Sequence, residues 1–146
     1  MTQTINQLNE AVETFLASDI ESIDWGYKQS PEKWSKKEII GHLIDSAQIN
    51  LQRFVRCTYE ENFKLTYEQV EWVQAGHYQD AEIAELLALW RLLNRQIIRV
   101  LEHYPAARLQ AKCDYSKKEV SLHSVEFLAQ DYVVHLKHHL KQVYDN

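Results

Sequence analysis

The chain has 146 residues, 45% of them hydrophobic, which is enough for one domain with a hydrophobic core over residues 1–146. Its net charge of −5 arises from interleaved acidic and basic residues, and without a basic stripe we expect no nucleic-acid partner. Two cysteines cannot form a disulfide framework, and the N-terminus lacks the basic and apolar regions of a signal peptide. No apolar run approaches the roughly 20 residues that cross a bilayer. We therefore expect a soluble, cytoplasmic protein with no membrane partner.

An all-α fold is expected, because only three Gly and two Pro interrupt a chain rich in helix-forming residues. The helical spacing of the first apolar residues predicts a helix from a cap at Thr4 to about Ile20. A second helix is predicted to begin at Ser35, which forms a capping box with Glu38, and to end at about Tyr59.

Residues 61–79 predict a long connection, because their apolar spacing is irregular. Within it, Trp72 and Val73 are expected on a short helix that Gly76 ends. A connection of this length can join two helices that a tight turn could not.

The rest of the chain predicts two further long helices. One begins at a cap at Asp80 and ends near Tyr104, because Pro105 disfavours helix at the residue before it. After a polar loop over residues 113–119, the other begins at a cap at Ser121 and continues almost to the C-terminus. Four helices of this length indicate a four-helix bundle.

The last predicted helix carries two histidines four residues apart. On a helical wheel with Val125 at zero, His135 falls at about 280° and His139 at about 320°, beside the core-facing arc. His138, at about 220°, points away from the core. At this spacing two neutral imidazoles can bind one divalent metal. Two partly buried helix histidines without a metal fit the same pattern, and the helix alone does not decide between these interpretations.

The second predicted helix places another histidine on a matching flank. With Ile39 at zero, His42 falls at about 300°, just outside the apolar arc, and Ser46 and Arg53 share its side. An imidazole, a hydroxyl and a guanidinium in a row are typical of a lined pocket. Taken singly, Ser46 and Arg53 also fit the ordinary polar border of an amphipathic helix.

Two motifs far apart in the chain carry a family resemblance. They are Trp34-Ser-x-x-Glu38-x-x-Gly-His42-Leu-x-Asp45-Ser46 and Asp131-Tyr-x-x-His135-x-x-His138-His139-x-x-Gln142. Their joint arrangement, with a Trp-containing third helix between them, resembles the DinB-like family, which includes YfiT-type metal-dependent hydrolases. The resemblance spans nearly the whole chain. It implies a four-helix bundle in up-down-down-up order, with a long crossover between the second and third helices.

The resemblance also implies a metal site. In the family, one histidine of the second helix and an H-x-x-x-H pair of the fourth bind a divalent metal, and here these residues are His42, His135 and His139. Three imidazoles suit several metals, and we expect Zn or Ni, with Fe or Mn as alternatives.

Relatives in this family include thiol-dependent S-transferases that use bacillithiol or mycothiol, a maleylpyruvate isomerase, and members without a known activity. The resemblance therefore implies an enzyme acting on a small-molecule substrate, in which the metal activates either a low-molecular-weight thiol or water for hydrolysis. Asp45 and His138 are candidate proton acceptors or partners of the metal ligands, and Arg53 is a candidate for holding an anionic substrate group. Each of the three also fits a structural role.

The competing hypothesis is a non-catalytic helical module, whose histidines are structural and whose apolar seam binds a partner or a second copy of the chain. Homodimers are common among such bundles. Trp72 and Trp90 are candidates for the seam, although we expect Trp90 in the core rather than in the seam.

Overall fold

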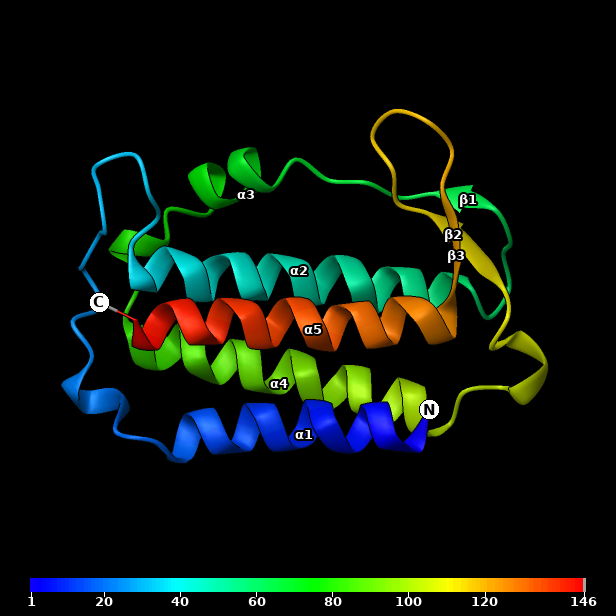
Figure 1. Cartoon of the computed structure of the whole chain (residues 1–146), viewed down its shortest axis with the longest axis horizontal. Helices are drawn as coiled ribbons and strands as arrows, with labels where there is room; N and C mark the ends of the chain where they lie inside the picture. The colour runs from blue at the N-terminus through cyan, green and yellow to red at the C-terminus, as the bar shows by residue number, and fades with distance from the viewer. Residues whose placement is uncertain (146) are drawn as a thin grey trace.

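The computed structural model describes residues 1–145, and four long helices lie side by side in it (Figure 1). They are α1 (Thr2–Ala17), α2 (Lys36–Arg56), α4 (Ile83–Glu102) and α5 (Val125–Tyr144). The helices α2 and α4 run in one direction and α1 and α5 in the other, which is up-down-down-up order (Figure 1). The prediction of a four-helix bundle with this order is confirmed.

One hydrophobic core is shared by the four helices, because α4 and α5 each pack against both α1 and α2. Phe15 of α1, Phe54 of α2 and Leu136 of α5 are fully enclosed in this core. Trp90 of α4 is also fully buried, edge-on to Phe15 with ring centroids 5.7 Å apart. Trp90 is therefore a core residue and not part of an exposed seam, whereas Trp72 is partly exposed.

The predicted crossover connects α2 to α4, which are parallel neighbours, so the chain must return along the whole bundle between them. It contains the strand β1 (Phe63–Lys64), the helix α3 (Gln69–Gly76) and the 3₁₀ helix η2 (Tyr78–Asp80). The helix α3 lies over α2 (Figure 1). It ends at Gly76, as predicted, and the next residue, His77, has a left-handed backbone with φ of 47°.

A small three-stranded sheet covers the end of the bundle at which α2 ends and α5 begins (Figure 1). In it, β1 pairs in parallel with β2 (Lys112–Asp114), and β2 pairs antiparallel with β3 (Leu122–Ser124). The helical predictions did not include this sheet, because strands of two or three residues are too short to show an alternating pattern. Two further 3₁₀ turns, η1 (Ile20–Ser22) and η3 (Ala106–Arg108), lie in the other connections.

The predicted start of α2 is correct in detail. The side chain of Ser35 accepts a hydrogen bond from the backbone N–H of Glu38 at 3.1 Å, and the Glu38 carboxylate accepts one from the N–H of Ser35 at 2.7 Å. These reciprocal bonds satisfy two backbone donors that a helix start leaves without partners. The start of α2 is thereby fixed, and with it the turn on which His42 lies.

The other three predicted caps were wrong. Thr4 is buried inside α1, and Asp80 belongs to η2, so that α4 begins after Glu82. Ser121 precedes β3, and Ser124 instead caps α5 by accepting a hydrogen bond from a backbone N–H. Each error places the helix start only a few residues away, because the apolar spacing predicts a helix but not its first residue. The helices α1 and α4 begin after Met1 and Glu82 without any side-chain cap. The helix ends predicted near residues 20, 59 and 104 likewise lie two or three residues beyond the observed ends.

Within residues 1–145, no helix combines the length and the apolar character that crossing a membrane requires.

Candidate metal centre

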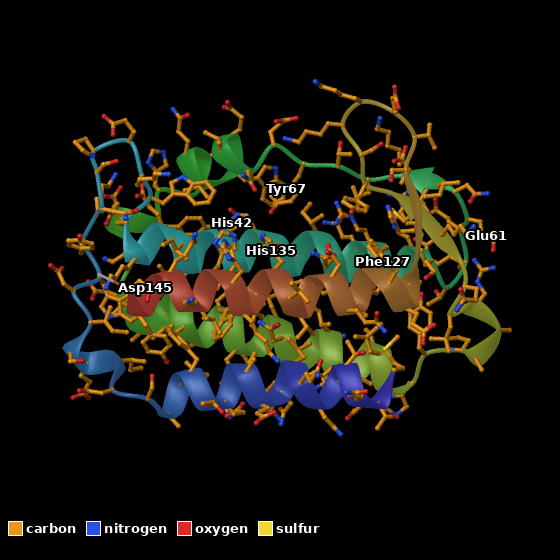
Figure 2. The ribbon with its side chains drawn as sticks, viewed as in Figure 1. His42, Glu61, Tyr67, Phe127, His135 and Asp145 are labelled. Atoms are coloured by element: carbon orange, nitrogen blue, oxygen red, sulfur yellow. The ribbon has the colours of Figure 1, made fainter. Side chains whose placement is uncertain are left out.

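Three histidines meet where α2 and α5 run next to each other, and Figure 2 labels two of them, His42 and His135. The Nε2 atom of His135 lies 3.1 Å from Nε2 of His42 and 3.1 Å from Nε2 of His139. One ring nitrogen from each residue lies within 4.8 Å of the other two. The structure thus brings together the three residues that the sequence singled out as a metal site.

The separations between these nitrogens suit a metal ion. A tetrahedral metal with bonds of about 2.0–2.1 Å to nitrogen holds its ligand nitrogens about 3.3 Å apart. The two separations of 3.1 Å are close to this value. Lone pairs of neutral imidazoles at such distances repel one another unless a proton or a cation lies between them. The three rings therefore form a group that can hold a metal ion.

The protonation of the three rings also suits a metal. Burial, with a smaller contribution from the neighbouring imidazoles, lowers the pKa of His42 to about 3 and that of His135 to about 4. Burial also lowers the pKa of His139. A lowered pKa keeps an imidazole neutral at physiological pH, and the neutral form is the one that donates a lone pair to a metal.

Gln142 holds the ring of His139 in a metal-binding tautomer. Nδ1 of His139 and the amide oxygen of Gln142 lie 2.7 Å apart, and because an amide oxygen only accepts, Nδ1 carries the proton. The Nε2 lone pair of His139 is then directed toward His135. Gln142 belongs to the second histidine motif, but the motif alone indicated no role for it. Its position three residues after His139, on the same helical face, is the signal that was available.

His138 lies beside the centre and not in it. Its side chain is exposed, as the helical wheel predicts, and its ring centroid is 5.1 Å from that of His139. The amide nitrogen of Gln142 donates to Nε2 of His138 at 3.2 Å. Gln142 therefore connects the exposed imidazole to the His139 ring.

Asp45 is a buried carboxylate one helical turn after His42. The hydroxyl of Tyr78 donates to its Oδ1 atom, whereas Oδ2 has no hydrogen-bond partner among residues 1–145. Burial raises the pKa of Asp45 to about 6. Nδ1 of His42 likewise has no hydrogen-bond partner among the described residues. Two unpartnered polar atoms thus lie on successive turns of α2.

Tyr78 was not recognised from the sequence. Its ring packs against two glycines, Gly41 and Gly76, and a Cβ atom at either position would overlap it. The glycines were the signal that the sequence offered. The chain has only three, and Gly41 lies next to His42, where the missing side chain leaves room for a neighbouring group.

Arg53 lies apart from the three histidines. It follows His42 by eleven residues, which is about 16 Å along the axis of α2. Its guanidinium donates to the carbonyl oxygen of Leu65 from Nε at 3.2 Å and from Nη2 at 2.8 Å. It also lies over the ring of Tyr115, 5.4 Å from the centroid. In this position Arg53 fastens the crossover to α2, and the structure does not bring it to the centre.

A cavity of about 460 Å³ opens beside His139, at the end of the bundle where α2 begins and α5 ends. The segment before α2, the first turn of α2, the helix α3 and the end of α5 all contribute to its walls. Trp34 lines this cavity and also stacks on His42, with ring centroids 4.9 Å apart and planes inclined by 33°. The cavity therefore reaches the histidines from the solvent side.

Solved structures with a similar fold include two proteins of Bacillus subtilis. YfiT from Bacillus subtilis, described as a probable metal-dependent hydrolase with an unusual four-helix bundle topology, matches 99% of this chain and 83% of its own length, with a TM-score of 0.84 and 18% identity. The DinB-like protein YjoA, also from Bacillus subtilis, matches 97% of this chain and 87% of its own length, with a TM-score of 0.61 and 16% identity. At these identities the two structures establish the fold alone. No protein with a curated description matches the sequence significantly.

The family assignment rests on the sequence as a whole. The profile of the DinB superfamily matches residues 2–143, which includes all four long helices almost to their last residue. The resemblance carried by the two histidine motifs is thereby confirmed, and this chain belongs to the DinB superfamily.

Proposed function

We propose that this chain is a metal-dependent hydrolase of a small-molecule substrate, with His42, His135 and His139 as the metal ligands. The observation that carries the proposal is the convergence of three Nε2 atoms from neutral imidazoles, of which that of His42 is buried and those of His135 and His139 are half-buried. The description of YfiT as a probable metal-dependent hydrolase supports it. Zn and Ni are the first candidates for the metal and Fe and Mn the alternatives, because imidazole nitrogen binds all of them.

Three protein ligands leave at least one coordination position open, as in catalytic zinc sites. When bound, a divalent metal supplies Lewis-acid chemistry: it polarises a carbonyl or phosphoryl oxygen and lowers the pKa of water to about 7. The residues of the chain would then place the substrate and move protons.

Several side chains fit these tasks. Asp45, whose pKa is raised to about 6, is our candidate for the group that takes up and releases a proton near neutral pH. Gln142 orients His139, and the exposed imidazole of His138, which Gln142 contacts, is a candidate for exchanging protons with solvent. Trp34 covers one face of His42 and so limits the access of water to that ring. Because Arg53 is held by the crossover, we give it a structural role in this proposal.

Thiol transfer is the second candidate function. The cavity of about 460 Å³ beside His139 is large enough for a low-molecular-weight thiol. A thiol that coordinates the metal loses its proton and becomes a nucleophile toward an electrophilic substrate. The same three histidines would serve both reactions, so the reaction itself must be measured.

One assay separates these functions. Protein loaded with Zn or Ni is incubated with a panel of esters and amides, and separately with chlorodinitrobenzene in the presence and absence of low-molecular-weight thiols. A hydrolase releases product without a thiol, and a transferase forms product only with one. In either case His42→Ala abolishes turnover. The turnover of His138→Ala shows whether the exposed imidazole of His138 exchanges protons with solvent during the reaction. Turnover that His42→Ala retains would refute the proposed centre, and a fully metal-loaded protein inactive in both assays would favour the non-catalytic module.

A further inference from the structure

The outer face of α4 carries apolar side chains at its centre. Leu92 is 61% exposed and Leu89 is 45% exposed, and Ala88 beside them is exposed as well. On a helical wheel with the buried Trp90 at zero, Leu92 falls at about 200° and Ala88 at about 160°, opposite the core. Leu89 falls at about 260°, three residues before Leu92, so the two leucines are neighbours on the helix surface. These three side chains form the α4 patch, which faces solvent in the single chain.

The α4 patch is more contiguous than the apolar residues on the opposite side of the bundle. The helix α5, which lies in front of α4 in Figure 1, exposes Phe127 and Val134. They are two helical turns apart, and the ring of Phe127 stacks on that of His123 with centroids 4.3 Å apart. Single exposed apolar residues are ordinary, whereas adjoining ones are typical of a surface that another molecule covers. The face of α4 is therefore the stronger candidate for an interface.

Opposite charges lie at the two ends of the α4 patch. Glu85 precedes Leu92 by seven residues and Arg99 follows it by seven, which is about 10 Å along the helix in each direction. On the same wheel Glu85 falls at about 220° and Arg99 at about 180°, so both share the outward direction of Leu92. Both are exposed, and neither forms an ion pair within residues 1–145. The exposed Arg95 adds to the positive end, and Arg99 donates to the neutral amide oxygen of Gln96.

We propose that two copies of this chain associate through the α4 patch, with the two α4 helices antiparallel about a two-fold axis beside Leu92. In such an interface the same surface serves both copies, so each contact occurs twice. The Leu92 side chains of the two copies meet at the centre. Because Glu85 and Arg99 lie equally far from Leu92, Glu85 of each copy comes opposite Arg99 of the other. A parallel arrangement would place like charges opposite one another, so the charges select the antiparallel one.

This pairing leaves the candidate metal centre accessible. The three histidines lie between α2 and α5, and the cavity beside His139 opens on the same side, whereas α4 lies across the bundle from α5 (Figure 1). The inference therefore does not depend on the proposed function, and the dimer is expected with or without a bound metal. It also places the seam of the homodimer on leucines of α4 rather than on Trp72 or Trp90.

The oligomeric state of the full chain tests the inference. Sedimentation equilibrium over about 1–200 μM should show a monomer–dimer equilibrium for the wild-type chain. Leu92→Glu should weaken the dimer at least about tenfold, because it places two carboxylates against each other at the apolar centre. Val134→Glu is the matched control: it introduces the same charge at a 67% exposed residue of α5 and should leave the dimer unchanged. Thermal unfolding checks that both variants fold, as expected for substitutions at exposed positions.

Exchange of the charges tests the antiparallel order. Glu85→Arg alone and Arg99→Glu alone should each weaken the dimer about tenfold, because like charges then lie opposite one another. When the two variants are mixed in equal amounts, they should form a dimer with about the wild-type affinity. The variant with positive charge at both positions then faces the variant with negative charge at both. No gain of dimer on mixing would contradict the antiparallel pairing of α4.

Two results would overturn the inference as a whole. A wild-type chain that stays monomeric at about 200 μM does not pair through the α4 patch, which then remains for a different protein. A dimer that Leu92→Glu leaves intact has its interface elsewhere, and its loss in Val134→Glu would place that interface on α5. If both substitutions weaken the dimer, the mixing of the charge variants decides between the two helices.

Discussion

Nδ1 of His139 donates a hydrogen bond to the amide oxygen of Gln142 across 2.7 Å, and this contact leaves Nε2 of His139 free to face His135 and His42. Side chains that orient a ligating histidine in this way commonly raise metal affinity, because they remove the cost of selecting the tautomer and rotamer. Gln142 is therefore part of the centre although it contributes no ligand.

Replacing Gln142 with alanine should weaken zinc binding by about 10- to 100-fold, because the His139 ring would lose its oriented tautomer. Competition against a chelator of known affinity measures the change. Gln130→Ala is the matched control, since Gln130 is an exposed glutamine on the same helix. Nitrogen-detected NMR of the metal-free proteins reports the tautomer directly, and equal zinc affinities in Gln142→Ala and Gln130→Ala would show that Gln142 does not orient the ring.

Zinc affinity should depend weakly on pH near neutrality. Protons compete with the metal only at a ring whose pKa lies at or above the working pH, and burial lowers the pKa of His42 to about 3 and that of His135 to about 4. Affinity should thus change little between about pH 8 and pH 6 and fall steeply below about pH 5. Titrations across this range test it. A steep loss beginning near the ordinary imidazole pKa of about 6.5 would contradict the burial of the three rings.

Asp45→Asn should stabilise the protein at alkaline pH. Folding raises the pKa of Asp45 from 3.8 to about 6. Between these two pH values the carboxyl group of Asp45 keeps its proton in the folded chain and has lost it in the unfolded chain. The carboxylate therefore costs stability above about pH 6 and costs nothing below about pH 4. The asparagine keeps an acceptor for Tyr78 and removes the buried charge.

We expect Asp45→Asn to raise the free energy of unfolding by on the order of 2 kcal/mol at about pH 8 and by little at about pH 4. Urea denaturation at both pH values measures it, with the exposed Asp131→Asn as control. If Asp45 also moves a proton in the reaction, the same variant loses activity while it gains stability. A loss of stability at the higher pH would show that the carboxylate has a stabilising partner.

Gly41→Ala should destabilise the fold by about 1–3 kcal/mol or more, because the added methyl group would overlap the ring of Tyr78. In a Tyr78→Ala background the same substitution should cost less by at least about 1 kcal/mol, since the ring is gone. Gly26→Ala is the control: its added Cβ would meet its nearest neighbour, Oδ1 of Asp24, at 3.6 Å. Strictly additive effects of the Gly41 and Tyr78 substitutions would show that the two residues do not pack together.

The bundle and its three histidines were predictable because both depend on helical periodicity. The apolar spacing of the four long helices fixes which face is buried, and His42, His135 and His139 lie on the flanks of those faces. Ser35 was identified correctly because a capping box requires two residues at a fixed spacing, whereas a single polar residue such as Ser121 has neighbours that cap equally well.

The remaining parts of the site depend on contacts between segments far apart in the chain. Tyr78 reaches Asp45 from the crossover, and no periodicity within α2 indicates that partner. The leucine carbonyl that holds Arg53 also belongs to the crossover, which is why a guanidinium on the histidine flank resembled a substrate-binding group. Trp34 joins the cavity to His42 only after the segment before α2 has folded back. Such contacts follow from the tertiary fold and not from local pattern.

The metal content of the untagged protein, purified without chelator, tests the central claim most directly. Elemental analysis should find about one Zn or Ni, or alternatively Fe or Mn, per chain, with the metal lost in His42→Ala and retained in His138→Ala. The two substitutions are matched, because one removes a converging imidazole and the other an exposed imidazole beside the centre. A wild-type protein that is folded, contains no stoichiometric metal and takes up none when Zn or Ni is added would contradict the account.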